Sequence, residues 1–348
     1  MTKHLYIHIP FCNQICSFCD FKRIKTNSYE IMKNFVKDII KQLHFSSTKN
    51  QYSTIYLGGG TPNHLPNDLL DELLHELSFY LSKDYEFTIE CNPDLLTIEQ
   101  AQIFKKNKLN RVSLGAQILN DKLLKQLRRN HSVDDIQNAI NNLRKVGIDN
   151  ISLDFIYDLP GETFSDLDKI FNFISDNQIK HISFYALEIK DNAILNKMGY
   201  KIDYSKEEEQ MKYIQQKFKE LNYKRYEISN WAINEKYQSQ HNKAYWLSHD
   251  WKALGFGASG FENQHLYNIK NKISQPIAEV EKLSEQDYYF QVLMMGLRLK
   301  EGIDITQLPY KLAYEHFKDK LVNCHIKNNH LICNDIDLLN DTLLELMD

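Results

Sequence analysis

Residues 12–19 have the sequence CNQICSFC, which places three cysteines within eight positions at C-x-x-x-C-x-x-C spacing. The run follows a strand-like stretch, His4 to Ile9, and the proline after it would end a strand, so we expect the cysteines to lie in a loop. Thiolates are the standard protein ligands of iron–sulfur clusters, and a cubane cluster has four irons. Cys12, Cys16 and Cys19 would bind three of these irons. The remaining iron would be open to a small molecule that carries an amine and a carboxylate.

Two other uses of cysteine fit this sequence less well. A structural zinc site usually has a fourth Cys or His at matching spacing, whereas Cys91, Cys324 and Cys333 are isolated and far from the motif. A disulfide framework is disfavoured because the chain opens Met-Thr-Lys-His, without an apolar signal segment. That opening predicts a reducing compartment, where disulfides are rare.

The composition narrows the class of protein. The chain has 348 residues, which at ~150 residues per domain suggests two domains, and 43% hydrophobic residues are enough for a sizeable core. The formal net charge of −4 gives no indication of a nucleic-acid partner, so we expect none. No apolar run approaches the ~20 residues of a membrane span, and we expect a cytoplasmic protein.

Strand-like and helix-like stretches alternate over the first two-thirds of the chain. The strand-like runs are residues 4–9, 54–57, 86–90, 111–114, 150–156 and 181–188. Apolar residues at helical spacing lie between them, at Ile31, Phe35, Ile39 and Leu43 in one helix and at Leu70, Leu73, Leu74, Leu77 and Leu81 in another. In a third helix, Ser132 is a predicted N-cap with Asp135 three residues later, and Gly147 is a predicted stop. This alternation predicts an α/β fold with a parallel sheet, whose ligands bind at the carboxyl ends of the strands.

A glycine run, Gly58-Gly59-Gly60-Thr61-Pro62, follows the second strand-like stretch. Glycines let the backbone pass close to a ligand and bind it through N–H and C=O groups. The run lacks the G-x-x-x-x-G-K-[ST] pattern of a phosphate-binding loop. Two interpretations stay open from these residues alone, a ligand-binding loop and a tight turn between a strand and a helix.

The cysteine motif after a first strand resembles the radical S-adenosylmethionine (radical SAM) superfamily, which has a partial (β/α) barrel. The resemblance implies a [4Fe-4S] cluster on Cys12, Cys16 and Cys19, with the amino and carboxylate groups of S-adenosylmethionine on the open iron. One electron from the cluster would cleave the sulfonium and produce a 5′-deoxyadenosyl radical. The resemblance also assigns the S-adenosylmethionine amino group to the glycine run.

Four polar residues match positions that contact the ribose, carboxylate or sulfonium region of S-adenosylmethionine in that superfamily, namely Glu90, Gln117, Arg129 and Asp154. The resemblance therefore implies a cofactor-binding set of Phe18, Phe21, Gly58, Gly59, Gly60, Thr61, Glu90, Gln117, Arg129 and Asp154. Without the resemblance, a salt bridge between barrel elements explains any one of the charged residues equally well. Asp158 stands where the family usually has glycine, which leaves the geometry of that turn open.

A second region is expected where the alternation fades. The predicted organisation is a partial (β/α) barrel of the radical SAM type over residues 1–228 and a smaller α+β C-terminal domain over residues 229–348. Residues 255–260 match G-x-G-x-x-G, but we expect no dinucleotide fold because no clear strand precedes them and no convincing helix follows. The other expected elements are a helix, a hairpin with an Asn-Asn turn and a short amphipathic segment, at residues 287–299, 325–333 and 335–348.

Most of the chain resembles the oxygen-independent coproporphyrinogen oxidase-like branch, through residues 6–12, 226–231 and 296–298. The dehydrogenases of that branch have a fourth cysteine two residues after the third, where this chain has Phe21. They also have an N-terminal extension, for which a first strand at residue 4 leaves no room. The heme chaperones of the branch share the Cys-x-Phe ending and an H-N-x-x-Y-W run, which is present here at residues 241–246.

The residues of the H-N-x-x-Y-W run have side chains that suit heme. Imidazole is a common axial ligand of heme iron, so His241 is a candidate ligand, and Tyr245 and Trp246 offer flat apolar surface. The alternative is a histidine that only satisfies hydrogen bonds at a domain boundary. The resemblance implies a chaperone that binds heme and transfers it to a heme-accepting protein, with a flavodoxin- or ferredoxin-type electron donor and peripheral membrane contact through the acceptor. The alternative function is oxygen-independent coproporphyrinogen III dehydrogenase.

Overall fold

The computed structural model describes residues 2–270 and 278–347. Its central strands are His4–Ile9 (β1), Tyr52–Gly59 (β4), Leu81–Cys91 (β5), Arg111–Gln117 (β6), Ile151–Tyr157 (β7), His181–Ala186 (β8) and Trp251–Leu254 (β11). Each of these strands is parallel to its neighbour, from β11 through β1 and β4 to β8. The parallel sheet expected from the alternation of strands and helices is therefore present.

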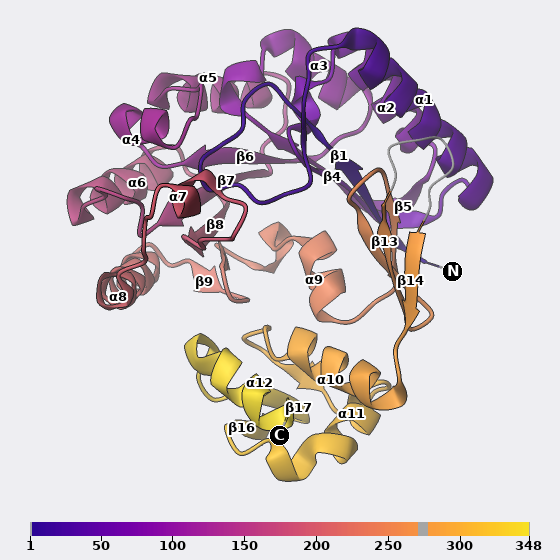
Figure 1. Ribbon diagram of the computed structural model, residues 1–348, viewed down its shortest axis with the longest axis vertical. Coiled ribbons are helices and arrows are strands. Elements are labelled where there is room, and N and C mark those ends of the chain that lie inside the picture. The colour runs from indigo at the N-terminus through magenta and orange to yellow at the C-terminus, as the bar shows by residue number, and fades with distance from the viewer. Residues whose placement is uncertain (1, 271–277, 348) are drawn as a thin grey trace.

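Antiparallel strands extend this sheet on both sides. They are Lys224–Arg225 (β9), Asn230–Ala232 (β10), Ser259–Glu262 (β12), His265–Ile269 (β13) and Ala278–Lys282 (β14). The order over the described residues is β14-β13-β12-β11-β1-β4-β5-β6-β7-β8-β10-β9 (Figure 1). The end strands β14 and β9 are not paired with each other, so the sheet curves without closing, as a partial barrel requires.

Helices cover the convex face of the curved sheet, and one short helix lies below its concave face (Figure 1). The helices on the convex side are Tyr29–Ser46 (α1), Asn67–Ser78 (α2), Ile98–Lys106 (α3), Asp121–Gln126 (α4), Val133–Lys145 (α5), Phe164–Asp176 (α6) and Tyr204–Glu220 (α8). The short helix on the concave side is Gln240–Trp246 (α9), and Ile194–Lys197 (α7) precedes α8. This arrangement leaves the concave face and the strand ends available for a site.

The cap of α5 forms as the sequence predicts. The Ser132 hydroxyl accepts a hydrogen bond from the Asp135 amide, and the Asp135 carboxylate accepts one from the Ser132 amide at 2.7 Å. This reciprocal pair satisfies two amides that a helix start leaves free. Gly147, with φ +75°, follows the helix in the left-handed region, as expected for a stop.

Two details of the predicted helical faces are wrong. In α1 the buried residues are Met32, Val36, Ile39 and Leu43, whereas Ile31 is 50% exposed. Positions 31 and 32 both continue a helical spacing, and only packing against the sheet decides between them. Leu81 is buried but belongs to β5, because α2 ends at Ser78.

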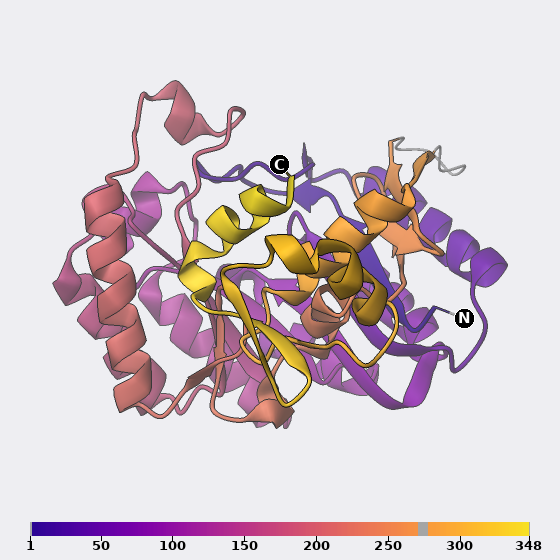
Figure 2. The same cartoon turned by 90° about the horizontal axis from the view of Figure 1, so that it is seen from below.

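The C-terminal elements form a second hydrophobic core. Its helices are Glu285–Gly296 (α10), Tyr310–Phe317 (α11) and Leu339–Met347 (α12), packed with a sheet of Ile303–Asp304 (β15), Cys324–Lys327 (β16) and His330–Cys333 (β17). Seen from below, these orange to yellow elements lie in front of the main sheet (Figure 2). Asn328 and Asn329 turn the β16–β17 hairpin with φ of 51° and 66°, which confirms the predicted Asn-Asn turn.

The glycine-rich run at 255–260 differs from its expected surroundings. A strand, β11, does precede it and pairs with β1, so the expectation that no strand precedes these glycines is wrong. The strand β12 follows instead of a helix, and therefore no dinucleotide-binding turn forms. Since β10 to β14 all join the main sheet, this sheet continues past the predicted domain boundary at 228/229, which stays a prediction.

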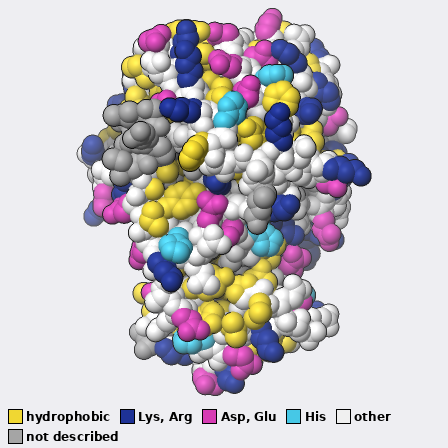
Figure 3. Space-filling model, turned by 90° about the vertical axis from the view of Figure 1, so that its right-hand side faces the viewer, with side chains coloured by type: hydrophobic (Ala, Val, Ile, Leu, Met, Phe, Trp, Pro, Cys, Tyr) yellow, Lys and Arg dark blue, Asp and Glu magenta, His cyan; other side chains and the backbone are white. Residues whose placement is uncertain are grey.

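The surface carries mixed charge on the face drawn in Figure 3, where Lys and Arg side chains are interspersed with Asp and Glu. Within residues 2–270 and 278–347, none of the helices combines the length and apolar character needed to cross a membrane.

Candidate functional site

One cavity brings most of the predicted site residues together. It has a volume of about 540 Å³, and its lining includes the carboxyl ends of β4 to β8. The predicted residues that line it are Cys12, Cys16, Phe18, Cys19, Phe21, Gly59, Gly60, Thr61, Glu90, Gln117, Arg129 and Asp154. Gly58 lies beneath Glu90 instead, since a Cβ at this glycine would be 3.0 Å from the Glu90 carboxylate. The sequence thus identified a set of residues that is contiguous in space, while their roles toward a cofactor stay predictions.

The cysteine loop is anchored on both sides. Before the motif, Phe11–Cys12 (β2) pairs with Ile24–Lys25 (β3). Within it, the Ser17 amide donates to the Leu127 carbonyl at 3.0 Å, and the Ser17 carbonyl accepts from the Leu195 amide at 2.9 Å. These contacts hold the three thiols at the rim of the cavity rather than in a free loop.

The thiols have the chemistry of cluster ligands. Burial raises the pKa of the Cys12 thiol to about 11 and also raises that of Cys19, so a bare thiolate is disfavoured there. Bound iron reverses this preference because it deprotonates a coordinating thiol. The Arg129 Nη1 lies 3.4 Å from the Cys16 Sγ, and the Thr61 hydroxyl lies 3.6 Å from the Cys12 Sγ.

The described part of the chain has no three His, Cys, Asp or Glu side chains arranged around one metal ion. The three thiols as they lie therefore do not form a mononuclear site. In a cubane each thiolate binds a different iron, and three cysteines of one loop are the donor set that such a cluster would use.

The glycine run packs directly against the cysteine loop. The Gly60 amide donates to the Ile9 carbonyl and the Thr61 amide to the Phe11 carbonyl, both at 2.8 Å. Gly59 has φ +112°, and a Cβ there would be 2.6 Å from the His8 ring. These two amides are already bonded, so an amino group of a ligand would have to be accepted by a carbonyl oxygen of this loop.

Glu90 and Asp154, two carboxyl groups of the cavity, form hydrogen bonds but no ion pair with another described residue. Glu90 accepts from the Tyr56 hydroxyl at 2.8 Å and from the Gly59 amide at 3.1 Å, and burial raises its pKa to about 7. Asp154 accepts from the Ser113 hydroxyl at 2.8 Å, and burial raises its pKa as well. Neither carboxyl group is therefore in a salt bridge of the kind that was the alternative interpretation, although the charge of Arg111 acts on Asp154 from a longer distance.

Arg129 and Gln117 are positioned by the end of β6. The Arg129 Nη2 donates to the Asn92 Oδ1 at 2.8 Å and to the Gly115 carbonyl at 2.9 Å, while its buried Nε has no partner among the described residues. The register of β6 against β7 shifts between Leu114 and Gln117, and Gln117 has φ +65°. Such a bulge redirects a side chain at a strand end.

Sequence reasoning missed some of the lining. Tyr56 and Asn92 both line the cavity and bond Glu90 and Arg129 respectively. Tyr56 has a readable signal, because it alternates with Gly58 along β4 and side chains two apart share a face. Asp158, the departure from glycine, adopts φ +61° and is fully buried, so the turn keeps a left-handed residue.

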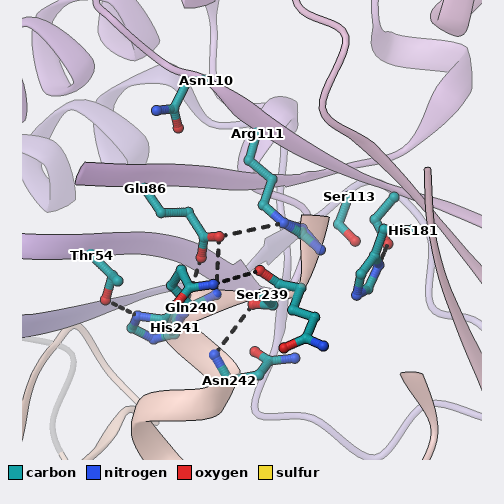
Figure 4. Close-up of polar contacts among 12 residues, drawn as sticks. Thr54, Glu86, Asn110, Arg111, Ser113, His181, Ser239, Gln240, His241 and Asn242 are labelled. Carbon is teal, nitrogen blue, oxygen red and sulfur yellow. Dashed lines mark hydrogen bonds and ion pairs between the residues drawn. The ribbon is translucent and has the colours of Figure 1, made fainter. Parts of the chain in front are cut away.

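The predicted heme residues lie beside the cavity and do not line it. His241 is buried in α9, and its Nδ1 lies 2.7 Å from the Thr54 hydroxyl (Figure 4). Its Nε2 lies 2.6 Å from the Tyr245 hydroxyl. Neither ring nitrogen is free, so a bond to iron requires one of these contacts to open. Trp246 has a buried Nε1 without a partner in the described chain, and the Arg298 guanidinium lies 5.5 Å from its ring centre.

Comparison with known proteins agrees with this geometry. The model of the radical SAM superfamily matches residues 6–174. The heme chaperone HemW of Lactococcus lactis is 30% identical over 355 residues, covering 95% of this chain and 90% of that protein. HemW of Buchnera aphidicola subsp. Acyrthosiphon pisum is 33% identical over 324 residues, and the alignment covers 86% of this chain and 83% of that protein.

A solved structure shares the fold. Coproporphyrinogen III oxidase (HemN) from Escherichia coli, a radical SAM enzyme, superposes with a TM-score of 0.82, over 100% of this chain and 90% of that one. At 16% identity this similarity is one of fold. The sequence identity to the two heme chaperones is higher and extends over most of the chain. The chain belongs to the HemW family of the radical SAM superfamily.

Proposed function

We propose that this protein is a heme chaperone with a radical SAM core. It carries a [4Fe-4S] cluster on Cys12, Cys16 and Cys19, binds S-adenosylmethionine at the open iron, and binds heme for transfer to an acceptor protein. The observation that carries the cofactor part is that three thiols share one cavity with two half-buried carboxyl groups outside any salt bridge, Glu90 and Asp154. When bound, the cluster would supply an electron for cleavage of the sulfonium.

The residues around the cavity suit the groups of S-adenosylmethionine. Arg129 offers a positive charge to the carboxylate, and carbonyl oxygens of the Gly58–Thr61 run accept from the amino group. Glu90 and Asp154 supply acceptors for the ribose hydroxyls and negative charge near the sulfonium. Phe18 and Phe21 add apolar surface at the rim.

Membership of the HemW family and the His241–Trp246 run support the heme part. His241 is the proposed iron ligand, and its bond to Tyr245 would open when heme binds. The proposal also includes a cytoplasmic location, a flavodoxin- or ferredoxin-type electron donor and peripheral membrane contact through the acceptor.

The second function, coproporphyrinogen III dehydrogenase, has the fold of the Escherichia coli enzyme in its favour. Phe21, 67% exposed, stands where the dehydrogenases have their fourth cysteine, which favours the chaperone.

Two anaerobic experiments on the reconstituted protein separate these functions. Heme is titrated into wild type, His241→Ala and the matched variant His249→Ala, and the Soret band is followed. We expect wild type and His249→Ala to bind heme alike and His241→Ala to give a shifted or weaker band. An unaltered spectrum in His241→Ala would remove that residue from the site. Coproporphyrinogen is then supplied with S-adenosylmethionine, and robust cluster-dependent decarboxylation would replace the chaperone proposal with the enzyme.

The S-adenosylmethionine site is tested separately. Losing a charged hydrogen bond costs ~1.5–3 kcal/mol, about ten- to hundredfold in affinity, so Arg129→Ala and Asp154→Asn should weaken binding to that extent. The exposed neighbour Arg128→Ala is the control. Both site variants should keep the cluster absorbance, and unchanged affinity in both would return these residues to a structural role.

A further inference from the structure

Arg111 is a buried cation without a hydrogen bond. It begins β6, its side chain is 2% exposed, and it lines the cavity. A guanidinium has five N–H donors, yet no nitrogen of Arg111 donates a hydrogen bond to another residue that the structure describes, and its Nε is enclosed without a hydrogen-bond partner. Burying a charged group without hydrogen bonds is costly, so this arrangement is expected where a ligand supplies the acceptors.

The nearest carboxylate does not satisfy this group. The Arg111 Nε lies 3.7 Å from Glu86 Oε2, beyond hydrogen-bond distance (Figure 4). Both Glu86 oxygens instead accept from backbone amides at the start of α9, those of Gln240 and His241, at 3.0 Å each. Glu86 therefore balances part of the charge of Arg111 and leaves its donors unused.

The surrounding side chains leave room for an anion partner. His181, also in the cavity lining, is bonded at both nitrogens, to Ser152 at 2.8 Å and to Tyr226 at 2.8 Å. The Asn242 side chain lines the same cavity and has no hydrogen bond to a described residue. Its amide can donate alongside the guanidinium.

Arg111 begins β6, at the opposite end of the strand from Gln117, and its charge acts on the Asp154 carboxyl group, which is the predicted cofactor residue beside it. Gln117 is six positions further along β6, which at ~3.3 Å per residue places the two Cα atoms at most roughly 20 Å apart, since the bulge before Gln117 shortens the strand. The cysteine loop lies at the Gln117 end. The cavity therefore reaches from the cluster residues to a second polar end.

We propose that Arg111 and Asn242 form a carboxylate-binding subsite for the ligand that shares the cavity with S-adenosylmethionine. The identity of the occupant rests on the proposed function, and it is a heme propionate. The planar guanidinium donates two parallel hydrogen bonds to the carboxylate, a geometry that lysine lacks. The site would select porphyrins with free acid side chains over their esters.

The test compares acids with esters. Heme and its dimethyl ester, and coproporphyrin III and its tetramethyl ester, are titrated into wild type, Arg111→Gln, Arg111→Lys, Asn242→Ala and the control Arg128→Gln. We expect wild type and Arg128→Gln to prefer an acid over its ester by tenfold or more. Arg111→Gln should lose this preference through weaker acid binding, and Arg111→Lys and Asn242→Ala should keep part of it. The affinity for S-adenosylmethionine should stay the same in all variants.

Several results would overturn the subsite. One is that Arg111→Gln binds the acid and the ester more weakly by the same factor. Another is that Arg111→Gln keeps the preference of wild type for the acid. A third is that Arg111→Gln loses affinity only for S-adenosylmethionine, which would assign Arg111 to the cofactor carboxylate. Absence of Arg111-dependent binding for both porphyrin pairs also overturns it. Wild type that binds coproporphyrin III through Arg111 but not heme would uphold the subsite and overturn the proposed function. If Arg111→Gln does not fold, Arg111→Lys and Asn242→Ala decide.

Discussion

The three cysteines of the motif share one loop but have different surroundings. Cys12 is nearly buried beside the Thr61 hydroxyl, whereas Cys16 is more exposed and lies beside Arg129. Cys91 is also buried and lines the cavity, from the end of β5. Cys324 and Cys333 face each other across the C-terminal hairpin and do not line the cavity.

Cluster assembly should distinguish these cysteines. We expect Cys12→Ala, Cys16→Ala and Cys19→Ala each to lose most of the visible iron–sulfur absorbance after anaerobic reconstitution, because each thiolate binds a separate iron. Cys91→Ala is the matched control in the same cavity and should keep the full absorbance. A complete cluster in Cys12→Ala would contradict the assignment of the motif.

Glu90 should make the stability of the cluster-free protein depend on pH. Burial raises its pKa from 4.5 to about 7, so the folded state holds this proton more tightly than the unfolded chain. The free energy of unfolding therefore falls as pH rises from about 4.5 to 7, by up to ~3 kcal/mol from this group.

Glu90→Gln should remove that dependence, and urea unfolding at pH 5 and pH 8 measures it. From pH 5 to pH 8 wild type should lose stability and the variant should not, so the free energy of unfolding of the variant should rise relative to that of wild type. The exposed Glu281→Gln is the control and should follow wild type. Identical pH dependence of wild type and Glu90→Gln would show that the carboxyl group is not desolvated.

At the scale of elements, the site depends on how two loops pack at the strand ends. The glycine run ends β4 and donates backbone hydrogen bonds to the segment that leads into the cysteine loop. A Cβ at Gly60 would be 2.8 Å from the Phe11 carbonyl oxygen and 2.8 Å from the Pro10 carbonyl carbon. Both neighbours are backbone atoms, so one of the two loops would have to move.

Gly60→Ala should therefore lower cluster yield and cost ~1–3 kcal/mol of stability, as overpacking does. Gly199→Ala is the control, because Gly199 has φ +76° but a Cβ there would meet no atom within 4 Å, so the substitution adds backbone strain without a contact. Iron and sulfide per protein and thermal unfolding measure the two effects. Equal cluster yield in both variants would show that the loops tolerate the displacement.

At the scale of the whole molecule, two hydrophobic cores are joined by polar contacts and by apolar ones, such as the stacking of Phe261 on Tyr288. One core surrounds the parallel sheet, and the other holds α10 to α12. Between them the Arg225 Nη1 lies 2.7 Å from the Asp337 carboxylate, and the Lys300 amide donates to the Tyr226 carbonyl at 2.9 Å. Because the two cores are separate clusters, we expect the C-terminal core to loosen separately from the core around the site.

Leu293→Ala tests this separation. Leu293 is fully buried in α10, and removing such a side chain typically costs ~2–5 kcal/mol. We expect faster amide exchange in α10 to α12 and unchanged cluster absorbance. Leu344→Ala, at a 60% exposed position of α12, should change neither. Parallel loss of the cluster and of C-terminal protection would show that the two cores fold as one.

Local patterns in the sequence were sufficient for the central strands, the α5 capping box and the Asn-Asn hairpin. Each depends on residues close together in the chain, as Ser132 and Asp135 do. The face of α1 and the strand β11 were not predictable in this way. Ile31 and Met32 fit the helical period equally well, and a four-residue strand is recognisable only by its partner β1.

The sequence by itself was enough to predict the chemistry of the cofactor end, because three thiols at fixed spacing and a glycine run are local features. Only the tertiary structure decided what they face. The curved sheet and α9 bring Arg111 and Asn242, far apart in the chain, to one cavity, and the α9 amides occupy Glu86 so that the guanidinium stays unbonded. Long-range packing fixes such pairings, and no local pattern encodes them.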